Sequence, residues 1–147
     1  MHTCGSLTEY RVLADFKLAS EPGNDRVAAE RVGHIVAQLA IAPARVERLR
    51  TAVAEATLNA IEHGNHFAAD KLVGVRVEAS SSDLCVTVSD EGGGRRGRSS
   101  AAPDLQAKLR GEQSPRGWGV FLIRNMVDDC SDESDSRGHR VHLRLRL

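Results

Sequence analysis

TAVAEATLNAIEHGNH, residues 51–66, has the apolar spacing of an amphipathic helix that runs into a glycine, Gly64. Within this helix Glu55, Asn59 and His63 are each four residues from the next, which is about one helical turn. The three polar side chains are therefore expected to form one stripe. Apolar residues flank this stripe on both sides: Val53, Ala56, Leu58, Ala60 and Ile61. Taken alone, the pattern also fits an ordinary exposed helix face with Glu and Asn in water.

Length and composition limit the classes of protein. The 147 residues fit one domain with a substantial core, and the 20 basic and 20 acidic residues leave no net charge. We therefore expect no direct nucleic-acid partner and no membrane partner. Aromatic residues make up 3% of the chain, which argues against a base-stacking platform. Three cysteines without CxxC spacing fit a reducing cytoplasm better than a disulfide framework.

Apolar periodicity divides the chain into strands and helices. Alternation predicts strands over residues 10–18, 73–79, 84–89 and 141–147, of which the middle two form an antiparallel hairpin. Helical spacing predicts helices over residues 25–40, 43–63 and 117–127. The acidic segment 128–135 is expected to be a solvated loop or an edge segment. Together these elements predict a single α/β domain over residues 1–147. It would be a two-layer sandwich with a mixed, mostly antiparallel sheet and helices on one face.

The first glycine-containing segment of interest is VSDEGGG, residues 88–94. Asp90 comes at the end of a predicted strand and precedes Gly92 and Gly94. This arrangement offers a fixed acceptor beside backbone that a ligand can approach closely. A lone motif of this kind most often forms only a turn between two elements and binds no ligand.

The second glycine-containing segment is SPRGWGVFLIRNMVDD, residues 114–129. Gly117 and Gly119 open a predicted helix, where unpaired backbone N–H groups and the positive end of the helix dipole favour phosphate. The phosphate-binding patterns GxxxxGK[ST] and GxGxxG after a strand are both absent from the chain. If a nucleotide binds, it must bind by another route.

In combination, these motifs resemble the ATP-binding fold shared by gyrase, heat-shock chaperone, histidine kinase and mismatch-repair ATPases. A Glu-xxx-Asn helix, a strand-terminal Asp-x-Gly-x-Gly, a glycine-rich loop and a Gly-x-Gly helix start occur in that order. The chain is more similar still to the bacterial anti-sigma-factor serine/threonine kinases. The stretches EATLNAIEHGN and RGWGVFLIRNMVD and the chain length carry this similarity, which extends from about Tyr10 to Leu147.

The resemblance implies a catalytic role for the helix that carries the polar stripe. Asn59 would supply the protein's oxygen ligand to Mg²⁺, which keeps its other positions for phosphates and water. Glu55 would be the general base that takes the proton from the attacking hydroxyl. His63 would lie at the helix end near the phosphates.

The resemblance also implies how ATP is held. Asp90 would accept a hydrogen bond from the adenine amino group, and the base would lie against the backbone of Gly92 and Gly94. Backbone N–H groups at the helix start would hold the α- and β-phosphates: Gly117, Trp118, Gly119 and Val120. Arg116 would add a charge near a terminal phosphate, although a solvated surface position fits this arginine equally well. Residues 95–115 would form a lid over the nucleotide.

Two features fall outside this pattern. In the resembling kinases the final strand often carries a threonine that supports the adenine-binding aspartate, whereas here Arg140 stands about where that hydroxyl is expected. Histidines at 63 and 66, and at 139 and 142, could be imagined as metal ligands. The second pair would point to opposite sheet faces and neither pair has further ligands nearby, so we expect no metal binding there.

The expected function is a kinase that transfers phosphate to another protein. It would phosphorylate an anti-sigma-factor antagonist and sequester a sigma factor, as a cytoplasmic homodimer. No phosphoacceptor-histidine helical pair precedes the motifs, which argues against a histidine autokinase. Two alternatives stay open: a nucleotide-gated binding module with little kinase activity, and a cousin kinase that activates a phosphatase.

Overall fold

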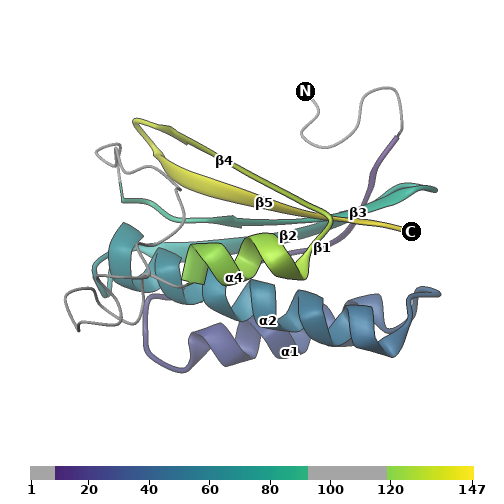
Figure 1. The fold of residues 1–147 in the computed structure, drawn as a ribbon. Helices are drawn as coiled ribbons and strands as arrows, with labels where there is room; N and C mark the ends of the chain where they lie inside the picture. Colours follow the sequence, from purple (N-terminus) through teal and green to yellow (C-terminus); the bar gives the residue numbers. More distant parts are fainter. Residues whose placement is uncertain (1–8, 93–118) are drawn as a thin grey trace, which may run out of the picture.

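A two-layer α/β arrangement is found in the computed structural model, which describes residues 9–92 and 119–147. The described strands form one sheet in the order β1-β2-β3-β5-β4, and every neighbouring pair is antiparallel. The helices of the described residues all lie on one side of this sheet (Figure 1). The predicted fold class is therefore confirmed, with an antiparallel sheet in place of the mixed one.

The elements follow the predicted blocks closely. The strands are β1 (Arg11–Ala19), β2 (Leu72–Ala79), β3 (Asp83–Ser89), β4 (Asp129–Asp135) and β5 (Gly138–Arg146). The helices are α1 (Asn24–Val36), α2 (Pro43–Asn59) and α4 (Gly119–Met126), and the π-helical turn η1 (Ala60–Gly64) continues α2. Pro43 lies in the first turn of α2, as predicted, where its missing N–H leaves no helical hydrogen bond unmade.

The core lies between the sheet and the helices because each element turns an apolar face inward. On β2 alternate residues are buried, which is the period expected of a strand with one covered face. The largest fully buried side chains come from both layers: Val32, Val36, Leu49, Val53, Ile61, Val73, Val75, Val77, Leu84, Val86, Val88 and Leu143. This core fixes α2 against the sheet and so determines where the polar stripe of α2 lies.

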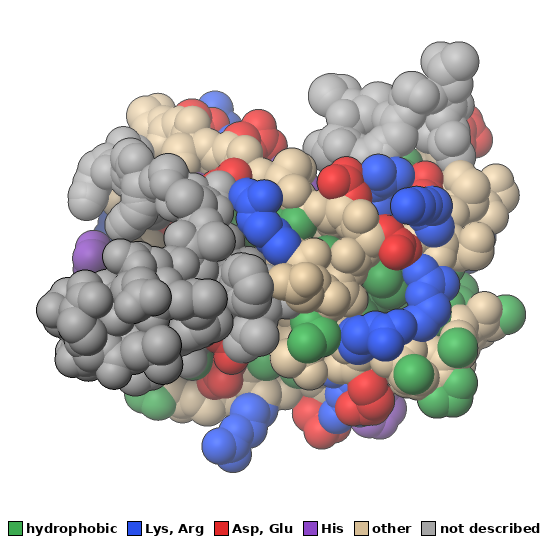
Figure 2. Space-filling view, viewed as in Figure 1, with side chains coloured by type: hydrophobic (Ala, Val, Ile, Leu, Met, Phe, Trp, Pro, Cys, Tyr) green, Lys and Arg blue, Asp and Glu red, His purple; other side chains and the backbone are tan. Residues whose placement is uncertain are grey.

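The acidic segment 128–135 forms the edge strand β4. Most of its residues are exposed, and it is held by its pairing with β5. Acidic side chains on an edge strand oppose pairing with a second chain. On the face shown in Figure 2, basic and acidic side chains are interspersed. Among the described helices, none is long and apolar enough to cross a membrane.

The cysteines depart from the expectation drawn from their number. Cys85 on β3 is disulfide-bonded, so an odd count without CxxC spacing did not exclude a disulfide. Cys130 on β4 is free and half-buried, and burial raises the pKa of its thiol to about 11. This thiol is therefore protonated at neutral pH, which makes it a poor nucleophile.

Asp128 connects the start of α2 with the end of β5. Its Oδ2 accepts a hydrogen bond from the Arg146 backbone N–H at 2.7 Å and another from the Arg45 guanidinium at 2.7 Å. The bond from Arg146 is the largest cause that holds the pKa of the Asp128 carboxyl below its ordinary value, and the charge of Arg45 adds to it. The ionised carboxylate therefore stabilises the folded state.

Asp128→Asn is expected to lower the free energy of unfolding at pH 7 by about 1 kcal/mol, a value discounted because a third of the side chain is exposed. A depressed carboxyl pKa contributes stability above the unfolded value, about 3.9, and loses it as the pH falls through the folded value. Urea titrations from pH 7 downward should show the difference between wild type and variant shrinking below about pH 4. Asp70→Asn, in an exposed loop, is the control. A difference that does not change with pH would contradict this account.

Candidate functional site

Several elements end or begin at one end of the sheet (left in Figure 1). β3 ends there, the turn between β4 and β5 lies there, and α2 passes into η1 there. The first turn of α4 lies at the same end. The fold therefore brings the helix motif and the strand-terminal motif together, although they are distant in the sequence.

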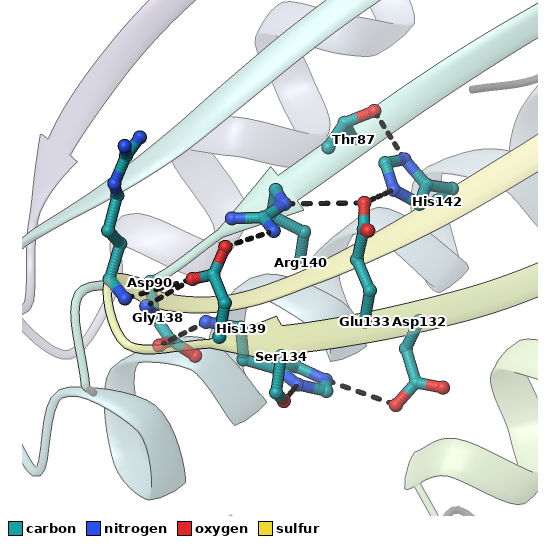
Figure 3. Close-up of polar contacts among 11 residues, drawn as sticks. Thr87, Asp90, Asp132, Glu133, Ser134, Gly138, His139, Arg140 and His142 are labelled. Carbon is teal, nitrogen blue, oxygen red and sulfur yellow. Dashed lines mark hydrogen bonds and ion pairs between the residues drawn. The ribbon is translucent and has the colours of Figure 1, made fainter. Parts of the chain in front are cut away.

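Asp90 follows directly after β3 and is held by backbone groups. The residue is buried, with 8% of its surface exposed. Its Oδ1 accepts a hydrogen bond from the backbone N–H of Gly92 at 2.9 Å. It also accepts one from the backbone N–H of His139 at 3.2 Å (Figure 3). Its own backbone N–H donates to the His139 carbonyl oxygen at 2.9 Å. These contacts fix the orientation of a buried carboxylate at the end of the sheet.

Three glycines surround Asp90 so closely that none has room for a side chain. A Cβ on Gly64 would overlap the Asp90 carboxylate, and a Cβ on Gly92 would overlap the carbonyl group of Gly64. Gly138, the first residue of β5, has a φ of +151°, and a Cβ there would overlap the Asp90 carbonyl oxygen. Bare backbone therefore encloses Asp90 on several sides, so packing as well as hydrogen bonds holds this residue in place.

The polar stripe of α2 lies only partly as predicted. Glu55 and Asn59 are one turn apart and half-buried at the C-terminal part of α2. The Asn59 carboxamide makes no hydrogen bond to the described residues, so its oxygen is available to a ligand. Beyond Asn59 the helix widens into η1, and His63 is exposed with Nε2 3.7 Å from a Glu62 carboxylate oxygen. Helical structure ends at Gly64, as predicted, but through a π turn of the kind often found at functional sites.

The helix start at the second glycine segment is described only in part. Gly119 is the first residue of α4, and Val120 follows it in the same helix. The N-terminal N–H groups of a helix are unpaired within the helix and favour an anion. Gly94, Arg116, Gly117, Trp118 and the predicted lid at 95–115 lie outside the described residues, so their predicted roles stay predictions.

The position of Arg140 corrects one expectation. The apolar residues of β5 face the helices: Val141, Leu143 and Leu145. Alternation along the strand turns Arg140 to the other face, where its guanidinium bonds to Glu133 at 3.3 Å and to Asp135 at 2.9 Å. The hydrogen bond from Arg140 is the main cause that lowers the pKa of the Asp135 carboxyl. Arg140 therefore does not replace a hydroxyl beside the buried carboxylate, which is supported by backbone N–H groups instead.

The two histidines of β5 point to opposite faces of the sheet, as their spacing predicts (Figure 3). His142 lies on the outer face, with Nδ1 2.9 Å from Thr87 Oγ1 and Nε2 2.9 Å from a Glu133 oxygen. His139 Nδ1 lies 2.7 Å from Ser134 Oγ. Each imidazole is thus engaged with a different set of neighbours.

Sequence reasoning missed three residues of this site. Gly64 was interpreted only as a helix stop, and Asn65 and Gly138 were assigned no role. The signals were a glycine directly after the helix motif and a glycine shortly before the predicted last strand, and both also suit ordinary turns. Their contacts with the Asp90 segment depend on tertiary structure, which local patterns do not report.

Comparison with known proteins identifies the family. Residues 18–146 match the histidine kinase-like ATPase domain, so the chain belongs to this family. The anti-sigma F factors of Bacillus licheniformis and of Geobacillus kaustophilus (strain HTA426) are each 30% identical over 131 residues, which covers 84% of this chain and 85% of each relative. That of Clostridium novyi (strain NT) is 26% identical over 129 residues, covering 87% of this chain and 90% of the relative. The resemblance inferred from the motifs is confirmed.

Proposed function

We propose that the chain is a Mg-ATP-dependent serine/threonine protein kinase that also acts as an anti-sigma factor. The observation that carries the proposal is the pair Glu55 and Asn59, one turn apart on the helix whose end packs against the buried Asp90. Membership of an ATPase family supports ATP as the ligand, and relatives named anti-sigma F factor support a sigma factor as a partner.

The nucleotide would be held at two places, one for the adenine base and one for the phosphates, and backbone groups of the protein contribute at both. Asp90 would accept a hydrogen bond from the adenine amino group, with the base against the bare backbone around Gly92 and Gly94. The phosphates would lie at the start of α4, where the N–H groups of Gly117, Trp118, Gly119 and Val120 are proposed to bind them. Arg116 would add a positive charge, and residues 95–115 would close over the bound nucleotide.

The chemistry would depend on two side chains of α2. When bound, Mg-ATP supplies the phosphoryl group to be transferred. Asn59, whose oxygen makes no bond to the described residues, fits a metal ligand of the oxygen type that Mg²⁺ prefers. Glu55 would remove the proton from the attacking serine or threonine hydroxyl, since it lies one turn away and is not needed as a ligand. His63 would stay near the phosphates at the helix end.

The proposed biological role is a partner switch in the cytoplasm. A homodimer of this chain would sequester a sigma factor in its nucleotide-bound form. Phosphorylation of an anti-sigma-factor antagonist would regulate release of that sigma factor. Neither nucleic acid nor a membrane would be contacted directly.

The test is incubation of the purified chain with Mg²⁺, γ-labelled ATP and an anti-sigma-factor antagonist protein. The proposal expects label on a serine or threonine of that protein. ATP binding without any transfer would overturn the kinase assignment and favour a nucleotide-gated binding module. If the chain transfers phosphate to a scaffold protein and does not bind a sigma factor, a kinase that activates a phosphatase would be favoured.

Asp90→Asn is expected to weaken ATP binding by about 1–3 kcal/mol, which is the range for losing one hydrogen bond to a charged group. The variant keeps the shape of the side chain, so its fold should be unchanged. Calorimetric titration with Mg-ATP measures the effect, with Asp70→Asn as a matched control in an exposed loop. Wild-type affinity in the Asp90 variant would contradict the adenine-binding role.

A further inference from the structure

Asn65 is a buried polar residue to which the proposed mechanism gives no part. It follows η1 directly and is 1% exposed. Its backbone N–H donates to the Ala60 carbonyl oxygen at 2.8 Å, which closes the π turn. Its side chain lies among three segments that are distant in sequence: the end of β1, the start of β2 and the segment after β3.

The Asn65 carboxamide uses all of its main hydrogen-bonding groups. Nδ2 donates to Ser20 Oγ at 2.9 Å and to the Leu72 carbonyl oxygen at 3.1 Å. Oδ1 accepts from the backbone N–H of Glu91 at 2.8 Å. Two donors and one acceptor are needed at the same time, and among the side chains of this size only a carboxamide supplies both.

The neighbours of Asn65 are linked to one another as well. Ser20 Oγ donates to the Lys71 carbonyl oxygen at 2.6 Å, so its own hydrogen is committed away from Asn65. The Glu91 carboxylate accepts from the backbone N–H of Leu72 at 3.0 Å. Glu91 is therefore held through its backbone by Asn65 and through its side chain by β2.

The bond from Glu91 matters because its N–H belongs to the peptide group that joins Asp90 to Glu91. Asn65 binds the N–H side of that peptide, and Gly138 packs against its carbonyl oxygen. Gly64, adjacent to Asn65, packs against the Asp90 carboxylate itself. Displacement of this peptide would shift the Cα of Asp90 and the side chain attached to it, and these contacts oppose that displacement.

We propose that Asn65 is a positioning residue that holds the Asp90–Glu91 peptide and thereby determines the preference for adenine over guanine. This role rests on the ATP site proposed above. Asn65 itself need not touch the nucleotide. It acts through the orientation of Asp90, so its loss should affect base selectivity rather than phosphate binding.

The experiment compares wild type with Asn65→Asp, Asn65→Ala and the control Ser20→Ala. Asn65→Asp removes both donors but keeps an acceptor for the Glu91 N–H, whereas Asn65→Ala removes that acceptor as well. Ser20→Ala removes the hydrogen bond that Asn65 Nδ2 donates to Ser20 Oγ. It leaves the hydrogen bond from the Glu91 N–H to Asn65 Oδ1 in place. Calorimetric titrations with Mg-ATP and Mg-GTP give the affinity ratio, and amide hydrogen exchange of the nucleotide-free protein reports on the Glu91 N–H.

Asn65→Ala is expected to reduce the ATP-to-GTP affinity ratio by about tenfold, the factor that corresponds to one hydrogen bond. Asn65→Asp retains an oxygen that can accept from the Glu91 N–H, so its ratio should stay within about twofold of wild type. Ser20→Ala should lower the melting temperature but keep the ratio within about twofold of wild type. A merely structural role would lower the melting temperature in all three variants without changing the ratio. A folded Asn65→Ala variant with the wild-type ratio would therefore overturn the proposal.

Hydrogen exchange in the wild type tests the contact without any variant. The Glu91 amide is expected to be protected as strongly as the amides of β3, although it lies beyond the strand. Exchange at the rate of an open loop would overturn the proposal even if the Asn65 variants failed to fold. Absence of ATP binding in the wild type would instead contradict the proposed function. Protection of the Glu91 amide would in that case still support the hydrogen bond between Asn65 and the Asp90–Glu91 peptide.

Discussion

Gly64→Ala is expected to reduce ATP affinity by about a hundredfold or more, the equivalent of roughly 2.7 kcal/mol. A Cβ at this position would overlap the Asp90 carboxylate, so either the carboxylate or the π turn must move. Either movement displaces the proposed adenine acceptor from a position that Gly92 and His139 fix on its other side. Stability should fall as well, by the ~1–3 kcal/mol typical of overpacking.

Gly33→Ala is the matched control for this change. Gly33 is buried on α1, and the nearest atoms to a Cβ there belong to the flexible Arg50 side chain, which can move aside. ATP affinity should therefore stay at the wild-type value in the control. Calorimetric titration of both folded variants, with thermal unfolding measured alongside, separates a local effect on the site from general destabilisation. A Gly64→Ala protein that binds ATP as the wild type does would show that Asp90 is not the acceptor.

Glu55→Gln and Asn59→Ala are expected to fail in different ways. Glu55→Gln keeps the size and shape of the side chain but cannot accept the proton. It should still bind Mg-ATP and its sigma-like partner, while phosphate transfer falls by ~10²-fold or more, the scale of losing a general base. Asn59→Ala removes the proposed protein ligand of Mg²⁺, so ATP affinity itself should fall, and partner binding with it if that binding requires nucleotide.

If Glu55 and Asn59 only lie on an ordinary exposed helix face, the two variants would behave differently from this expectation. Both substitutions would then be nearly silent, within about 0.5 kcal/mol of wild-type stability and without functional effect. Measuring the ATP affinity and the transfer rate of each variant distinguishes the possibilities. Wild-type transfer by Glu55→Gln would rule out the base assignment.

Local patterns in the sequence predicted the layers of the fold well. Alternation along β2 and β3 predicted a hairpin with one buried face, and Pro43 predicted the start of α2. These features depend on the period of apolar residues and on the backbone preference of one residue, so they can be seen without tertiary contacts. The acidic strand β4 was harder to predict, because its pairing with β5 rather than its own composition holds it in place.

The details around Asp90 could not be predicted in the same way. Nothing in the local pattern of residues 60–64 distinguishes a π turn from the last turn of an α-helix, yet that turn brings Gly64 and Asn65 to the Asp90 segment. The face to which Arg140 points depends on register, where a difference of one residue exchanges the two faces of a strand. The alternation of Val141, Leu143 and Leu145 already indicates the outer face for this arginine, and the register of β5 in the fold confirms it.

Calorimetric titration of the wild-type protein with ATP and with GTP, each in the presence of Mg²⁺, tests the central claim most directly. A buried carboxylate fixed at the end of β3 should select the base that carries an amino group at the contacted position. Saturable ATP binding, with GTP weaker by about tenfold or more, is the result that the account predicts. Equal binding of the two nucleotides, or no binding of either, would contradict it.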